Sequence, residues 1–294
     1  MNIQVNGHLD IQAVDNIIQT FNKSSSKSKL TLDLRFVTGI SIECISWLVI
    51  VLLSLKKEKV KISIIAPSDD NAVLYKLKMW RFFDVLKEED IYNSIKKQIY
   101  VHPFVNKHWI ISLKLLKSNK DVRSIINGVL DDLDFCFKNL NYTKNDIGHL
   151  STVVSEACMN VLDHAGDDAI GVFAAELIRM EPKRLVISLA DDGCGLRTSL
   201  SRSNANATDW DDETVIRQAL TKGVSGVVDG DRGLGLPAVV TKLSQYRGAL
   251  YIRSGQGSMR HRMTHEGTLE EVFSSEEVPV PGTLISVSLP PATN

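Results

Sequence analysis

Three short segments of this 294-residue chain carry side chains that could together bind a nucleotide. In the first, apolar residues recur at helical spacing, and Glu156, Asn160 and His164 follow one another at intervals of four. Each therefore lies about 40° past a full turn from the one before, and the three form one polar stripe. The Asn160 amide oxygen could ligate a divalent cation, and Glu156 could act as a general base. A solvated face of an ordinary helix would have the same pattern.

The second segment follows the aliphatic run at 184–190, which predicts a strand. Asp191 stands at the end of that strand and could accept a hydrogen bond from an exocyclic amine such as adenine N6. Gly193 and Gly195 would let the backbone turn sharply and approach a flat ligand. Asp-Gly pairs are also common in plain turns, so this segment alone does not define a site.

The third segment, Arg232-Gly233-Leu234-Gly235, opens an apolar helix predicted over 236–246. The backbone N–H groups and the dipole at the start of a helix favour a bound phosphate. Arg232 or Lys222 could neutralise a γ-phosphate, although a surface charge is the ordinary explanation for Lys222. The chain has no G-x-x-x-x-G-K-[ST] segment, which argues against a P-loop.

These segments, in this order and followed by Gly282-Thr283 before a strand at 284–289, resemble the GHKL ATPase superfamily of DNA gyrase, histidine kinases and anti-sigma-factor serine kinases. The resemblance covers roughly Asn119 to Pro290. The stretch VSEACMNVLDHA is most similar to the Asn box of the anti-sigma-factor kinases. The resemblance implies a two-layer α/β sandwich of the histidine-kinase-like ATPase type that binds ATP and Mg²⁺.

The same resemblance implies a role for each matching residue. Glu156 would be the general base, Asn160 the magnesium ligand and Asp191 the carboxylate that reads adenine. The segment between Leu196 and Gly230 would be a lid over the phosphates, although 199–208 would equally suit a surface loop. The full set of implied nucleotide-binding residues is Asn160, Asp191, Gly193, Gly195, Arg232, Gly233, Leu234, Gly235 and Thr283.

The N-terminal part alternates strand-like pieces (29–34, 60–65) with helical ones (11–21, 45–55, 71–80), which predicts a separate small α/β layer fold. Its stretch LTLDLRFVTGISIECISWLVIVLL resembles the STAS domain of anti-sigma-factor antagonists. Glu43 stands where that family has its phosphoacceptor serine, so we expect no phosphorylation there. Glu43 could complement the helix dipole or imitate the phosphorylated state.

We therefore predict a STAS-like regulatory or docking domain over 1–95, a linker and first strand over 96–117, and a GHKL-type domain over 118–294. The net charge of −1 and the lack of a strongly basic block give no reason to expect nucleic acid as a partner. The apolar run at 45–55 is too short to span a bilayer, so we expect no membrane association. Four scattered cysteines and no signal-type leader predict a cytoplasmic protein with reduced thiols.

The segment 253–281 is predicted as a polar insertion between two strands. Its His261 and His265 have a spacing that could hold a metal on a helix, but Gly255, Gly257 and Gly267 argue against a continuous helix.

The function that these features predict is an ATP- and Mg²⁺-dependent switch. It would be a serine/threonine protein kinase or slow ATPase that acts on a STAS-like or sigma-factor-type protein, and it could form a homodimer. The alternative is a non-catalytic module in which ATP sets the conformation that grips a partner. A histidine autokinase is disfavoured because no histidine lies in a recognisable dimerising phosphoacceptor helix.

Overall fold

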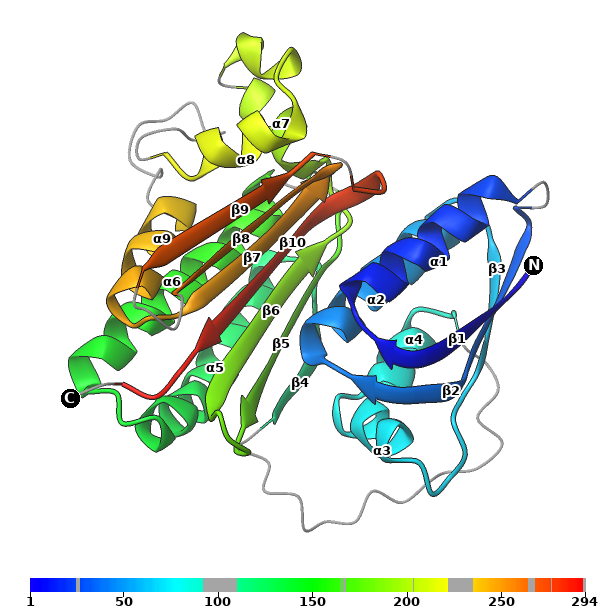
Figure 1. Ribbon diagram of the computed structural model, residues 1–294, viewed down its shortest axis with the longest axis horizontal. Helices are drawn as coiled ribbons and strands as arrows, with labels where there is room; N and C mark the ends of the chain where they lie inside the picture. The colour runs from blue at the N-terminus through cyan, green and yellow to red at the C-terminus, as the bar shows by residue number, and fades with distance from the viewer. Residues whose placement is uncertain are drawn as a thin grey trace.

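The computed structural model describes residues 1–24, 27–91, 110–164, 166, 168–202, 204–221, 235–263, 268–275 and 277–292. These residues form a three-stranded parallel sheet and a seven-stranded antiparallel sheet, with helices packed on both. The mixed α/β class predicted from the sequence is confirmed, and the N-terminal part lies directly beside the larger sheet (Figure 1).

The smaller sheet has the strand order β1-β2-β3 and belongs to the N-terminal part. The strand β2 runs to Ile40, six residues beyond its predicted end, and β1 and α4 are not predicted, whereas the other elements agree to within three residues. The elements are β1 (Asn2–Leu9), α1 (Ile11–Lys23), β2 (Lys29–Ile40), α2 (Ile42–Lys57), β3 (Lys61–Ile65), α3 (Ala72–Met79) and α4 (Phe82–Glu88).

The larger sheet has the order β4-β5-β6-β10-β7-β8-β9. Its elements are β4 (Ile110–Leu116), α5 (Asn119–Asn139), α6 (Lys144–His164), β5 (Gly171–Ile178), β6 (Arg184–Asp191), α7 (Gly195–Ser201), the 3₁₀ turn η2 (Ala205–Thr208), α8 (Asp212–Ala219), α9 (Gly235–Gln245), β7 (Ala249–Gly255), β8 (Gly257–Met263), β9 (Leu269–Ser274) and β10 (Val280–Leu289).

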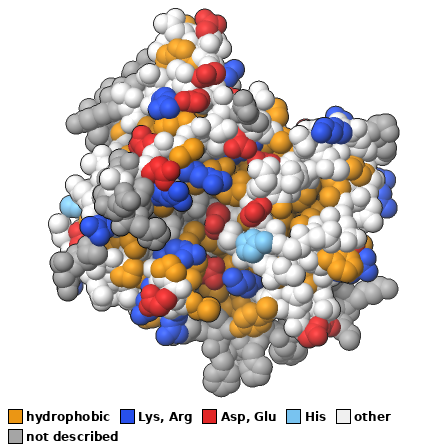
Figure 2. Space-filling view, in the orientation of Figure 1, with side chains coloured by type: hydrophobic (Ala, Val, Ile, Leu, Met, Phe, Trp, Pro, Cys, Tyr) orange, Lys and Arg blue, Asp and Glu red, His pale blue; other side chains and the backbone are white. Residues whose placement is uncertain are grey.

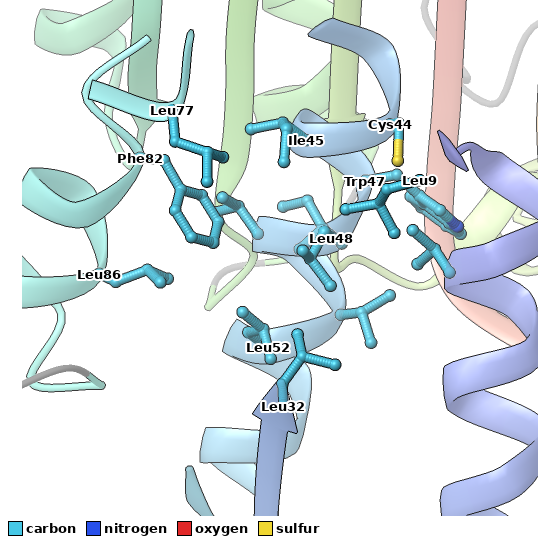
Figure 3. Close-up of a cluster of buried hydrophobic side chains, with 14 of the residues drawn as sticks. Leu9, Leu32, Cys44, Ile45, Trp47, Leu48, Leu52, Leu77, Phe82 and Leu86 are labelled. Carbon is cyan, nitrogen blue, oxygen red and sulfur yellow. The ribbon is translucent and has the colours of Figure 1, made fainter. Parts of the chain in front are cut away.

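Helix α2 lies between the two sheets and is buried nearly all round. It packs against α1, α4 and β3 on one side and against β5, β6 and β10 of the larger sheet on the other. Figure 3 shows Ile45, Leu48 and Leu52 of this helix among side chains of the N-terminal part, with Phe82 on one side and Leu9 on the other. A helix that is apolar on every face needs such a double contact. The two parts of the chain therefore share one hydrophobic core.

The larger sheet has two apolar faces, as the alternation along β6 demonstrates. Leu185, Ile187 and Leu189 belong to the core that β6 forms with α5, α6 and α9. Val186 and Ala190 belong instead to the core around α2. Successive side chains of a strand point to opposite faces, so every odd-numbered residue of β6 faces the layer of three helices.

A buried ion pair joins α1 to the larger sheet. The Nη2 atom of Arg253 on β7 lies 3.3 Å from Oδ2 of Asp15, and neither side chain has more than 1% of its surface exposed. Arg253 also donates to the carbonyl oxygens of Gly255 (2.9 Å) and Val278, and Trp47 Nε1 donates to Asp15 Oδ1 at 3.4 Å. Burial raises the pKa of Asp15 more than Arg253 and Trp47 lower it.

Two expectations about local structure are wrong. The segment 253–281 is no insertion, because β8 and β9 within it extend the sheet beyond β7. Buried Met259 and His261 alternate there with exposed Arg260 and Arg262, a period of two that polar residues concealed in the sequence. The surface-loop alternative for 199–208 is also wrong, since α7 reaches Ser201 and η2 covers Ala205–Thr208, and Leu200 and Ala207 are buried in a small cluster of their own with α8.

No helix among the described residues has both the length and the apolar content that crossing a bilayer requires. On the face seen in Figure 2, basic and acidic side chains are intermixed.

We expect Asp15→Ala to lower the free energy of unfolding by about 3 kcal/mol, because Arg253 would remain buried without its carboxylate partner. Urea denaturation measures this loss. The control is Glu88→Ala, which breaks an ion pair with Arg81 whose side chains are 56% and 45% exposed and should cost less than about 1 kcal/mol. Equal losses in the two variants would contradict a stabilising role for the buried pair.

Candidate functional site

Asp191 and Thr283 are paired across adjacent strands at one end of the larger sheet. Asp191 is the last residue of β6, and the register places it opposite Thr283 of β10. Both are 7% exposed. By the alternation along β6, Asp191 points to the face that α6 and α9 cover. Two residues predicted from separate motifs are therefore neighbours on the helical side of the sheet.

The backbone around this pair is tightly constrained. The N–H of Gly193 donates to Asp191 Oδ1 at 2.9 Å, and the N–H of Thr283 donates to the same carboxylate. Gly282 has φ +69°, and a Cβ added to it would lie 1.8 Å from the Asp191 carbonyl oxygen. Gly195 also has a positive φ, +73°. Glycine is required at both positions because a side chain would be strained, and at Gly282 would also clash.

Ser254 links the end of β7 to β10 and to the start of α7, a role that the sequence did not predict. Its Oγ accepts from the N–H of Leu196 at 3.0 Å and donates to the Gly282 carbonyl at 3.1 Å. Ser254 lies opposite Thr283 in the pairing of β7 with β10. Only knowledge of that pairing could have singled out this serine.

Burial raises the pKa of Asp191, the N–H donors of Gly193 and Thr283 lower it, and the neighbouring Asp192 carboxylate raises it, with a net pKa of about 7. An acid held in this way is poised to lose its proton when a hydrogen-bond donor arrives. A carboxylate has about four lone-pair positions, so two N–H donors leave room for a ligand's amine.

Helix α6 carries the predicted catalytic and metal-binding positions. The backbone at Glu156 and Asn160 is helical, as predicted, and α6 packs against β5 and β6. The side chains of both residues lie outside the described part of the structure. Gly235 is the first residue of α9, whereas Lys222 and the run Arg232-Gly233-Leu234 lie outside the described residues.

An apolar cavity of about 40 Å³ lies between the helices and the sheet, immediately beyond the Asp191–Thr283 pair. Leu189 and Ile285 line it, each two residues from a member of that pair and on the same face. Val154, Ala157 and Cys158 of α6 line the opposite wall. A cavity of roughly 150 Å³ is needed for one benzene ring, so a purine would enter only if these walls moved apart. A buried acid beside an apolar slot nevertheless fits the chemistry of adenine.

Residues 196–202 and 204–221 of the segment expected to form a lid are described, and they include α7, η2 and α8. Asp212, the first residue of α8, accepts from the N–H of Gln256 at 2.7 Å and forms a 2.9 Å ion pair with Arg197. Arg217 stacks on the ring of Phe273, with its guanidinium carbon 3.5 Å from the ring centroid. These contacts dock α7 and α8 on the strands β7 to β9. Whether residues 222–230 cover a ligand is outside what the structure describes.

His261 lies on strand β8, so the i, i+4 helical spacing considered for a metal does not apply. Its Nδ1 is 2.9 Å from Oε1 of Glu271 on β9. His265 lies outside the described residues. Within the described ranges, no cluster of three or more His, Cys, Asp or Glu side chains could hold a metal ion.

An antiparallel sheet with three helices on one face, and a buried acid followed by glycines at a strand end, defines a two-layer ATPase sandwich. Residues 145–293 match the family model described as "Histidine kinase-, DNA gyrase B-, and HSP90-like ATPase". The match spans half of the chain, from α6 to beyond β10, and the chain belongs to this family. Members of the family bind ATP, usually with Mg²⁺.

One solved structure similar to this chain is the histidine kinase domain from Erythrobacter litoralis EL346 blue-light activated histidine kinase. It shares 14% sequence identity over 76% of this chain and 89% of that chain, with a TM-score of 0.28. That likeness is too slight to transfer a residue or a role. No curated protein is matched by this sequence.

We expect Asp191→Asn to stabilise the nucleotide-free protein at pH 7.5 but not at pH 4. Between its ordinary value and about 7, the folded state holds a proton on Asp191 that the unfolded chain has lost, so stability falls as pH rises through this window. The amide keeps an oxygen for the Gly193 N–H and removes the charge. Each kcal/mol regained should raise the melting temperature by about 2–4 °C.

Asp211→Asn is the control for this experiment. Asp211 is exposed, caps α8 through the N–H of Thr214 at 2.7 Å, and has its pKa lowered by the hydrogen bonds of Thr214. Its charge contributes stability that is present at pH 7.5 and lost in acid, so this variant should be slightly less stable at pH 7.5. If Asp191→Asn also loses stability at pH 7.5, the folded protein does not favour the neutral form of Asp191 over the charged carboxylate.

Proposed function

We propose that the protein is an ATP- and Mg²⁺-binding regulatory switch of the anti-sigma-factor serine kinase type. It would transfer the γ-phosphoryl group of ATP to a Ser or Thr of a partner protein, or hydrolyse ATP slowly. The observation that carries this proposal is the pairing of Asp191 with Thr283 beneath α6, inside the family-matched region. Asp191 would accept the adenine amine, and Gly193 and Gly195 would let the base approach the backbone.

The positions on α6 support a catalytic role in addition to binding. Asn160 would hold Mg²⁺ through its amide oxygen, and Glu156, one turn earlier, would deprotonate or orient the attacking hydroxyl or water. The bound ion would neutralise charge on the phosphates. Phosphoryl transfer depends mainly on positioning and charge neutralisation, so these groups with the backbone at the start of α9 would be sufficient. Arg232, Gly233, Leu234 and Gly235 would line the phosphates.

The acceptor would belong to another molecule and not to this chain's STAS-like domain. Burial is the main cause of the raised pKa of Glu176 on β5, and Glu43, at the position of the STAS phosphoacceptor, is close enough to add to it. Glu176 lies five residues along β5 from Gly171, the partner of Asp191, which is a distance of about 17 Å. It shares its face of the sheet with Val172 and Ala174, the face that α2 covers. The larger sheet therefore separates Glu43 from the proposed ATP site.

A separate STAS-like protein or a sigma-factor-type protein is the partner that we propose. The test is to incubate the purified protein with γ-labelled ATP and Mg²⁺, alone and with proteins encoded beside it. Label on a partner's Ser or Thr would support the kinase, and free phosphate alone would support a slow ATPase. Tight ATP binding without any turnover would support the non-catalytic module instead.

We predict that Glu156→Gln keeps ATP binding but lowers turnover by roughly two to four powers of ten, because a general base is lost while the binding groups remain. Single-turnover release or transfer of labelled phosphate measures this. Glu181→Gln is the control, since Glu181 is exposed in the turn before β6, at the end opposite Asp191. Unchanged turnover in Glu156→Gln would make Glu156 an ordinary helix-surface residue.

We predict that Asn160→Ala removes most of the stabilisation that ATP with Mg²⁺ gives to the fold. A ligand at about one hundred times its dissociation constant adds roughly 2.7 kcal/mol to the stability of the protein. Thermal denaturation with and without nucleotide measures the difference for each variant. A melting temperature that nucleotide raises equally in both proteins would place the magnesium ion elsewhere.

A further inference from the structure

One side chain of the N-terminal part reaches the nucleotide end of the larger sheet. Lys57 is the last residue of α2, and its Nζ lies 2.7 Å from Oδ2 of Asp192. The same Nζ donates to the carbonyl oxygen of Asp168 at 2.7 Å. Asp192 directly follows Asp191 in the chain, so Lys57 contacts the residue next to the proposed adenine-reading carboxylate.

Asp192 fixes the geometry of this end of the sheet. Its side chain has none of its surface exposed, and its Oδ1 accepts from the N–H of Ile170 at 2.7 Å. Its own N–H donates to the carbonyl oxygen of Ile170 at 3.2 Å. Asp192 thus ties the segment that leads from α6 into β5 to the end of β6. Lys57 contacts both of these segments, through the Asp168 carbonyl before β5 and the Asp192 carboxylate after β6.

A buried carboxylate in this place requires a compensating cation. Without Lys57, the charge of Asp192 would stand unopposed beside Asp191, and leaving one member of a buried pair alone is strongly unfavourable. Relief would come from water entering or from the segment at 168–170 moving. Either change would disturb the position of Asp191 and the hydrogen bonds that hold it.

We propose that Lys57 is a positioning residue of the nucleotide site: the N-terminal domain, through α2, holds Asp192 and thereby Asp191 in the arrangement that binds the base. This inference rests on the function proposed above. The affinity for the nucleotide base would then depend on the position of α2 against the larger sheet, because this helix runs without interruption from Glu43 to Lys57. A partner that shifts α2 would change the affinity for ATP without touching the ATP site.

The test is the affinity of Lys57→Gln for ATP and ADP by calorimetric titration. We expect both dissociation constants to rise by the same factor, about five- to tenfold, since the disturbance is at the base and not at the γ-phosphate. The factor is modest because Lys57 is 43% exposed. Lys56→Gln is the matched control: it removes the same charge one residue earlier, where Lys56 donates to the Glu89 carbonyl oxygen, and should bind as the parent does.

Two further variants separate positioning from general damage. Lys57→Arg keeps the cation and should recover most of the affinity. Adding Asp192→Asn to Lys57→Gln removes the unopposed charge, and the double variant should bind ATP more tightly than Lys57→Gln alone. Its melting curve, compared with that of the single variant, shows whether folding is preserved.

A parent protein that binds no ATP would overturn both this inference and the proposed function. A parent that binds ATP, with Lys57→Gln equal to Lys56→Gln, would overturn the inference alone. It would also fail if neither Lys57→Arg nor the added Asp192→Asn recovers affinity.

Discussion

The burial of α2 on all sides is the constraint on which the rest of the structure depends. An antiparallel sheet with helices on one face would leave the other face, with Val172, Val186 and Leu284, apolar and exposed to water. Here α2 of the N-terminal part covers that face, and the same helix covers the smaller sheet with its other side. Neither sheet could lose the helix without exposing its core, so the two parts behave as one cooperative unit.

Polar contacts give this apolar interface its register at two places. Asp15 and Arg253 pair in its interior, and Lys57 and Asp192 pair at the rim. Burial of apolar area alone would tolerate sliding of a helix across a sheet. A buried charge pair does not, because any shift would leave one charge buried without its partner. The rim pair lies next to Asp191. The docking of the N-terminal part and the shape of the proposed base site are therefore fixed by the same helix.

The sequence predicted the parts of this protein whose information is local. Periodicity located α1, α2, β6 and α9, and Asp191 lies at the end of β6 as the sequence predicts. It did not predict β8 and β9, because polar side chains mask their alternation. It also could not predict Ser254 or the pairs made by Arg253 and Lys57, since these contacts join positions that only the pairing of strands and the docking of α2 bring together. The family match supports the ATPase part, and the STAS-like identity of the N-terminal part stays a prediction.

We propose that ATP binds where β6 and β10 end beneath α6, with its base read by Asp191. A crystal structure of the protein with a non-hydrolysable ATP analogue and Mg²⁺ tests it most directly. We expect the adenine amine within hydrogen-bond distance of the Asp191 carboxylate, the ring against Leu189 and Ile285, and the magnesium ion on Asn160. A nucleotide bound elsewhere, or one whose base leaves Asp191 without contact, would contradict it.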